Sequence, residues 1–285
     1  MLEGRDFVLS EAPTLLAARE WRADARGIPV VMLHGWLDNL GSFTDLAPRL
    51  EGRRCVAVDL PGHGKSGHRS AEASYLVPEA LWDVERAVAA LGCERVILVS
   101  HSLGATISTM YAAAYPHRVA ALAAIEGVVP QTEPAHGFVE RLRLHAAARA
   151  KTPKPLPVYP SVDAALAVRV AVARHVDAES MRPIVERGLK TVQGGFTWAA
   201  DSRLRHPSAW RLTPEQAINI IDSVQCPVML FKATQGLPWD DASVFGTAVA
   251  KRKWPITTIK GFHHLHLDAP AEVAAVINQF LKDVR

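Results

Sequence analysis

Short apolar runs alternate with segments of helical periodicity along most of the chain, and this alternation constrains the fold more than any other feature. The apolar runs occupy residues 30–33, 55–58, 96–99, 122–125, 228–231 and 257–259. Each run is too short for a helix and is bounded by turn-forming residues. The helical segments between them occupy residues 75–91, 102–115, 214–221 and 270–281. Buried strands that alternate with helices predict an α/β fold, in which a mostly parallel sheet is flanked by helices on both faces.

Residue patterns near the ends of several predicted strands and helices support their placement. Residues 7–9 and 14–21 precede the first parallel strand, and we expect them to form an antiparallel pair at the sheet edge. Thr213 and Gln216 have the spacing of a capping box at the start of a helix. Asp268 is expected to cap the last helix in a similar way.

One region breaks the alternation. From Pro130 to His206 the chain is rich in alanine and arginine, has helical character and contains no buried strand run. We expect this segment to form a helical lid, inserted after the sixth strand, over the sheet edge at which open α/β sheets bind ligands. The predicted division is therefore a first part of the core at residues 1–129, a lid at 130–206 and a second part of the core at 207–285.

The charge and hydropathy of the chain exclude some classes of partner. Its 285 residues include 32 Lys+Arg and 29 Asp+Glu, which gives a net charge of +3, and the basic residues are scattered. This pattern provides no footprint for nucleic acid or an anionic membrane surface. No segment approaches the roughly 18 consecutive apolar residues of a spanning helix, and residues 1–7 lack the apolar region of a signal peptide. We expect a cytoplasmic protein with no nucleic-acid partner and no membrane partner.

The strand at 96–99 runs directly into Ser102, which a helical segment follows. A strand, a tight turn and a helix in this order are typical of a nucleophile elbow. Small residues two positions before and after the nucleophile allow the strand and helix to approach closely. Gly104 fills the second of these positions, whereas Ser100 stands at the first, where glycine is usual. Ser102 is therefore the candidate nucleophile.

A serine hydroxyl needs a neighbouring base that accepts its proton. His263, His264 and His266 lie between the last predicted strand and the last helix, at the sheet edge that also holds Ser102. A metal site in this cluster is a competing interpretation, but the three cysteines and the other histidines have no ligand spacing. The sequence favours a catalytic base, with no metal and no organic cofactor.

Four motifs together resemble the α/β-hydrolase superfamily and, within it, the serine hydrolase-like proteins. They are His-Gly-Trp-Leu-Asp-Asn at 34–39, Asp-Leu-Pro-Gly-His-Gly-Lys-Ser at 59–66, His-Ser-Leu-Gly at 101–104, and the segment 261–270. The resemblance implies that Ser102 is the nucleophile and that His263 is the catalytic histidine, with His264 as the alternative. It also implies an oxyanion hole formed by the backbone N–H groups of Trp36 and Leu103.

The acidic partner of the histidine has more than one candidate. Members of the superfamily most often place an Asp shortly after the penultimate strand, where this sequence offers only the more distant Asp240 and Asp241. Some relatives use a Glu at the end of the preceding strand, and Glu126 ends an apolar run at that place. A carboxylate in such surroundings needs a partner, which a histidine provides. We favour Glu126, with Asp240 or Asp241 as alternatives.

A serine nucleophile with a histidine base predicts acyl transfer. The dehalogenases and epoxide hydrolases of the superfamily use an Asp nucleophile, so their reactions are disfavoured here. We expect a serine esterase that acts on a small or medium carboxylic ester, with this small molecule as its partner. Hydrolysis of a C–C bond, a lactone or a thioester would use the same residues. A non-catalytic ligand-binding protein of the same fold is the alternative of another class, because Ser100 and the position of the acid depart from the usual pattern.

Overall fold

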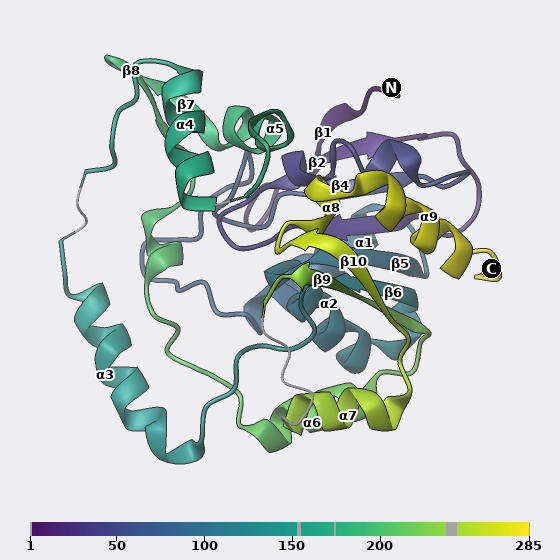
Figure 1. Cartoon of the computed structure of the whole chain (residues 1–285). Helices are drawn as coiled ribbons and strands as arrows, with labels where there is room; N and C mark the ends of the chain where they lie inside the picture. Colours follow the sequence, from purple (N-terminus) through teal and green to yellow (C-terminus); the bar gives the residue numbers. More distant parts are fainter. Residues whose placement is uncertain (1, 153–154, 174, 238–243, 285) are drawn as a thin grey trace.

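A twisted sheet forms the centre of the molecule (Figure 1). The computed structural model describes residues 2–152, 155–173, 175–237 and 244–284. Within these residues eight strands are arranged in the order β1-β2-β4-β3-β5-β6-β9-β10, in which β2 is antiparallel to both neighbours and the other pairs are parallel. The strands are β1 (Arg5–Ser10), β2 (Leu16–Trp21), β3 (Val30–Leu33), β4 (Cys55–Val58), β5 (Val96–His101), β6 (Val119–Ile125), β9 (Val228–Gln235) and β10 (Ile256–Phe262). The predicted α/β class and the antiparallel edge pair are confirmed.

The inner strands are apolar at consecutive positions because both faces of the sheet are covered. In β3, Val31 and Leu33 belong to one buried cluster, whereas Val30 and Met32 belong to another. The first cluster includes side chains from the helices α1 (Glu79–Ala90), α2 (Leu103–Ala114), α6 (Pro214–Ser223) and α7 (Val244–Arg252). The second includes side chains from η1 (Leu40–Phe43), η2 (Ala47–Arg49), α8 (Leu265–Asp268) and α9 (Pro270–Phe280). Each fully buried Leu, Ile or Val stabilises the fold by about 1.5–3 kcal/mol.

The chain between β6 and α6, called here the β6–α6 segment, leaves the sheet at its carboxyl edge and returns to it. Its helices are η4 (Ala135–Gly137), α3 (Phe138–Arg149), α4 (Val162–Ala173), α5 (Ala178–Gly188) and η5 (Ser202–Arg205). It also contains an antiparallel hairpin of β7 (Leu189–Val192) and β8 (Gly195–Trp198). Figure 1 shows α4, α5 and the hairpin as one group, and α3 as a separate helix that stands away from the sheet.

Two local expectations are corrected. The segment 130–206 is expected to be helical without a buried strand run, and besides helices it contains the β7–β8 hairpin. The strands of this hairpin are short and partly exposed, so they form no continuous apolar run in the sequence. Asp268 does not cap the last helix, because the chain forms α8 first and Asp268 ends it; its Oδ2 accepts a hydrogen bond from the Phe262 N–H at 2.7 Å. The capping box at Thr213 and Gln216 is confirmed.

In the described parts of the chain, no helix has the length and apolar character needed to cross a membrane.

Candidate active site

Ser102 occupies a strained turn between β5 and α2. Its backbone has φ 51° and ψ −113°, a conformation that costs a non-glycine residue about 1–3 kcal/mol. The turn is tight, since a Cβ added to Gly104 would lie 2.1 Å from the Leu33 carbonyl oxygen. Ser100 fits at the first small-residue position because its hydroxyl is buried and hydrogen-bonds to the Ser108 hydroxyl at 2.6 Å. The sequence thus places a serine on a sharp turn at the carboxyl edge of the sheet.

His263 connects Ser102 to a carboxylate. It lies in the turn after β10, with its Nε2 3.0 Å from the Ser102 Oγ and its Nδ1 3.3 Å from the Glu126 Oε2. The neighbouring His264, the alternative base, is directed elsewhere, and its Nε2 lies 3.1 Å from the Asp38 Oδ2. The structure therefore brings together Ser102, His263 and Glu126 and separates His264 from them.

Glu126 is fully buried at the end of β6. The backbone N–H of Ala233 donates to its Oε1 at 2.7 Å, and the N–H of Leu237 donates to its Oε2 at 2.9 Å. A Cβ at residue 236 would lie 2.1 Å from Oε2, so Gly236 is required for this close approach. These contacts fix the carboxylate beside His263. The alternatives Asp240 and Asp241 lie outside the described residues.

A cavity of about 1100 Å³ lies beside Ser102 and Glu126, which contribute to its wall. Trp36 and Leu103 also line it. Leu103 is the first residue of α2, where a backbone N–H has no partner within the helix and is available to an anion. A cavity of this size with a few converging polar groups suits a small molecule.

Comparisons with known proteins agree with this geometry. Residues 28–160 match the family model for the alpha/beta hydrolase fold. A serine hydrolase-like protein from Danio rerio is 30% identical, and the alignment covers 90% of this chain and 82% of the relative. The chain belongs to the α/β-hydrolase family.

Solved structures extend this comparison. The hypothetical protein PA1622 from Pseudomonas aeruginosa PAO1 is 38% identical, with a TM-score of 0.90 over 98% of this chain and 99% of that one. A thioesterase domain from the curacin biosynthetic pathway has a TM-score of 0.84 over 97% of this chain and 99% of that one. Its identity is 24%, so it supports the fold alone.

Two further residues of this α/β hydrolase hold the histidine turn in place. The Nε2–H of the buried His101 donates to the His263 carbonyl oxygen at 2.9 Å. The carboxylate of Asp38 binds both His264 and, at 2.6 Å, the Arg169 guanidinium. Burial by itself would raise the pKa of Asp38, but His264 and Arg169 hold it well below its usual range. Both residues stand inside motifs of the sequence, but their roles could not be predicted from it, because their contacts are with distant parts of the chain.

This group also has the composition of a metal site. Asp38, His101 and His264 each offer one ligand atom, and these atoms lie within 4.8 Å of one another. However, Asp38 already neutralises the Arg169 guanidinium and accepts a hydrogen bond from His264. The arrangement therefore fits a buried hydrogen-bond network that supports His263.

Several buried histidines of the hydrolase are held in the neutral form. Burial lowers the pKa of His34 to about 4 and the pKa of both His63 and His266 to about 3. Burial also lowers the pKa of His101 well below its usual range, and the neighbouring histidines add to this effect. His34 connects two loops, because its Nδ1 lies 2.8 Å from the Gly35 carbonyl oxygen while its Nε2 accepts from the Leu60 N–H at 3.0 Å.

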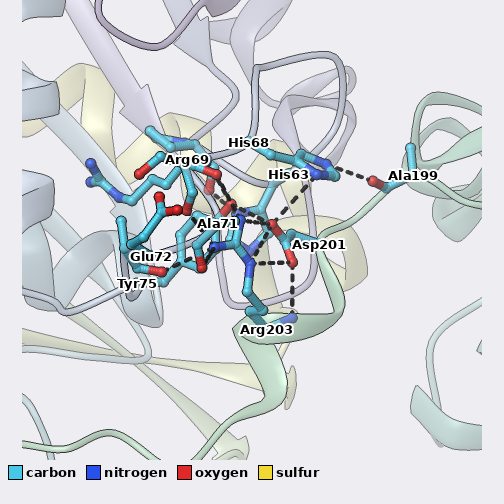
Figure 2. Close-up of polar contacts among 12 residues, drawn as sticks. His63, His68, Arg69, Ala71, Glu72, Tyr75, Ala199, Asp201 and Arg203 are labelled. Carbon is cyan, nitrogen blue, oxygen red and sulfur yellow. Dashed lines mark hydrogen bonds and ion pairs between the residues drawn. The ribbon is translucent and has the colours of Figure 1, made fainter. Parts of the chain in front are cut away.

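Asp201 and Arg203, which follow the β7–β8 hairpin, fasten the β6–α6 segment to the loop at residues 69–75. Figure 2 shows Arg203 between Asp201 and the backbone of this loop. Its guanidinium binds the Asp201 carboxylate at 2.7 Å and donates to the carbonyl oxygens of Arg69, Ala71 and Ala73 at 2.7–3.1 Å. The Tyr75 hydroxyl donates to Asp201 at 2.8 Å. These contacts form one wall of the cavity.

Proposed function

We propose that this protein is a serine hydrolase that cleaves a carboxylic ester of a small molecule through an acyl-enzyme on Ser102. The observation that supports the proposal most strongly is the position of His263, whose two ring nitrogens lie within hydrogen-bond distance of Ser102 and of the buried Glu126. A base held between a hydroxyl and a buried carboxylate is oriented to accept the hydroxyl proton, and the carboxylate stabilises the imidazolium that forms.

In the proposed first half-reaction, the Ser102 Oγ attacks the carbonyl carbon of the ester while its proton passes to the His263 Nε2. The carbonyl oxygen becomes an oxyanion, and we assign its stabilisation to the backbone N–H groups of Leu103 and Trp36. The bond between the carbonyl carbon and the alcohol oxygen then breaks as His263 returns the proton to the leaving alcohol. The acyl group remains on Ser102.

In the second half-reaction, His263 takes a proton from water, and the resulting hydroxide attacks the acyl carbon. The bond from this carbon to the Ser102 Oγ breaks, Ser102 recovers its proton from His263, and the carboxylic acid leaves. Glu126 keeps His263 oriented in both half-reactions. The β6–α6 segment acts in this proposal as a lid, because residues from it line the same cavity as Ser102.

A thioester substrate is a second candidate, because the same residues and steps cleave a C–S bond. A protein that only binds a ligand would retain the fold and the cavity but would not react at Ser102. Labelling and turnover therefore separate the catalytic proposals from the binding one.

The test combines fluorophosphonate labelling with hydrolysis of p-nitrophenyl butyrate. We expect the wild type to be labelled and to turn over, and Ser102→Ala and His263→Ala to lose at least about 10³-fold in kcat. Ser223→Ala, an exposed serine on α6, is the matched control and keeps both properties. A folded wild type that neither reacts with the probe nor turns over would contradict the proposed function.

A further inference from the structure

The cavity over Ser102 has an unusual balance of charge. Among the described residues, two carboxylates and six cationic side chains line it. The carboxylates are Asp83 and Glu126, and the cations are Arg69, Arg149, Lys151, Arg203, Arg205 and Arg211. The chain as a whole has a net charge of only +3, so this excess of positive charge is concentrated at the cavity.

Two of the six cations form ion pairs with nearby carboxylates, and a third lies near a carboxylate that already has another partner. Arg69 binds Asp83 and also lies 3.8 Å from Glu79. Arg203 binds Asp201, as Figure 2 shows. Arg211 interacts electrostatically with the Glu133 carboxylate, which forms its ion pair with Arg141. Arg69 and Arg203 build the wall, and their charge is locally balanced.

The other three cations are Arg149, Lys151 and Arg205. Within the described parts of the chain, none of them forms an ion pair with a carboxylate. Arg149 is held by neutral acceptors, because it donates to the Ser74 hydroxyl and to the Glu72 carbonyl oxygen, both at 2.8 Å. All three side chains are exposed, so they lie on the solvent side of the cavity.

The wall also contains an apolar part, formed by Leu60, Leu76, Val77, Ile107 and Val129. Ile107 belongs to α2, the helix that begins after Ser102. The cavity thus combines an apolar surface near the reactive serine with uncompensated positive charge toward solvent. This combination suits an amphiphilic anion, whose apolar part is buried and whose charge faces the exposed cations.

We propose that the substrate is an acyl ester or thioester that carries a phosphate or carboxylate several bonds from the reacting carbonyl, and that Arg149, Lys151 and Arg205 bind this anion. The inference rests on the proposed hydrolase function and adds the charge of the substrate. For a thioester, the Ser102 Oγ–acyl bond forms as the C–S bond breaks, and the thiol leaves with the proton that Ser102 gave to His263. Water then releases the acid as in the ester reaction.

The test uses two pairs of substrates, each with one anionic and one neutral member that share the same acyl chain length. Hexanoyl-CoA, which carries phosphates, is compared with the neutral S-hexanoyl-N-acetylcysteamine. The p-nitrophenyl monoester of adipic acid, which carries a carboxylate, is compared with p-nitrophenyl hexanoate. For each pair, the measured quantity is the ratio of kcat/KM for the charged member to kcat/KM for the neutral member. The two pairs distinguish a phosphate from a carboxylate.

The variant is the triple substitution Arg149→Ala/Lys151→Ala/Arg205→Ala. We expect it to lower the ratio about tenfold for at least one pair, because each exposed charge contact contributes a factor of about 1.4 to 5. The matched control is Arg26→Ala/Lys190→Ala/Lys282→Ala, which removes the same charge at exposed positions outside the cavity wall and leaves both ratios unchanged. A rise from 50 to 500 mM NaCl lowers the wild-type ratio.

Ratios that are equal in the wild type and the triple variant for both pairs would overturn the proposal, even with full activity on the neutral substrates. If the wild type hydrolyses no member of either pair, the proposed esterase or thioesterase function fails. The charge inference is then tested separately by titration calorimetry with CoA. If CoA binds about tenfold more weakly to the cavity variant than to the control variant, the result supports an anion site formed by Arg149, Lys151 and Arg205. Equal affinities of the two variants for CoA reject this site.

Discussion

The sheet edge that holds Ser102 and the cavity wall built by the β6–α6 segment are stabilised by different forces. At the sheet edge, buried backbone hydrogen bonds fix each group: the Ser102 N–H donates to the Ile125 carbonyl oxygen at 2.9 Å, and the Glu126 N–H donates to that of Phe231 at 3.0 Å. In the wall, α3 has no buried residue, and side-chain contacts such as those of Arg203 and Arg149 connect the segment to the core.

This difference shows how the two regions divide their tasks. The groups proposed to react are held by the most buried part of the fold, in which local opening costs the most free energy. The groups proposed to select the substrate lie on the β6–α6 segment, which side-chain contacts connect to the core. Residues of this segment can therefore be substituted while the sheet stays folded. The following predictions test this division, from the largest expected effect to the smallest.

Substitution Glu126→Gln is expected to lower kcat by about 10³- to 10⁴-fold. The carboxylate accepts from Ala233, Leu237 and His263, whereas an amide has one acceptor atom and must place its NH₂ group against one of these donors. The measurement is ester hydrolysis, with Glu140→Gln on the exposed face of α3 as the control. A decrease in kcat smaller than tenfold would mean that Asp240 or Asp241, and not Glu126, is the acidic partner of His263.

Acidification from pH 7.5 to pH 5 is expected to lower the free energy of unfolding. The folded-state pKa values of His34, His63 and His266, about 4, 3 and 3, lie below the unfolded value of about 6.5. The unfolded state therefore binds more protons between these limits, so the stability that the neutral histidines provide is complete above pH 6.5 and is lost as the pH falls. Each of the three histidines lowers the free energy of unfolding by up to about 2 kcal/mol between pH 7.5 and pH 5.

Urea unfolding at pH 7.5, 6 and 5 measures this slope. His266→Gln removes one of the buried groups and should reduce the slope, whereas His136→Gln, at an exposed position in η4, should leave it unchanged. A stability that does not change over this pH range would contradict the neutral state of the buried histidines.

Substitution Arg203→Ala is expected to destabilise the fold by about 1–3 kcal/mol, because it leaves the buried Asp201 carboxylate without its cation and removes several hydrogen bonds to the loop at 69–75. Since the sheet still holds Ser102 and His263, KM should rise more than kcat falls. Arg205→Ala, two positions away and without an ion pair among the described residues, is the matched control for stability. Equal destabilisation by the two substitutions would argue against the proposal that Asp201 and Arg203 hold the β6–α6 segment against the loop at 69–75.

Substitution Arg143→Ala is expected to have the smallest effect. Arg143 lies on α3, is 73% exposed and pairs only at 3.4 Å with Glu140, which is similarly exposed. Surface pairs of this kind contribute about 0–1 kcal/mol. The free energy of unfolding and kcat should both stay close to the wild-type values. A loss comparable to that of Arg203→Ala would mean that α3 carries part of the stability of the wall.

Much of the fold was determined by features that are local in the sequence. The apolar runs specified the strands because a strand covered on both faces must be apolar at consecutive positions, and the capping box at Thr213 and Gln216 specified the start of α6. The strand, turn and helix around Ser102 likewise predicted a serine on a sharp turn. Such signals involve neighbours in the chain and are therefore visible without a structure.

Other features were decided only by the tertiary structure. The short strands of the β7–β8 hairpin are partly exposed, so their pattern is weak. The Asp268 carboxylate accepts from the Phe262 N–H and does not cap the last helix. The role of His101 depends on the His263 carbonyl group, 162 positions away.

The candidate site shows both cases together. The order of strand, turn and helix identified Ser102, the resemblance to the α/β hydrolases singled out His263, and Glu126 was favoured because some relatives place the acid at the end of the same strand. Only the folded chain placed their atoms within hydrogen-bond distance and turned His264 toward Asp38. The physical reason is that periodicity reports which face of an element is buried, whereas the contacts of one side chain depend on the packing of segments that are far apart in the sequence.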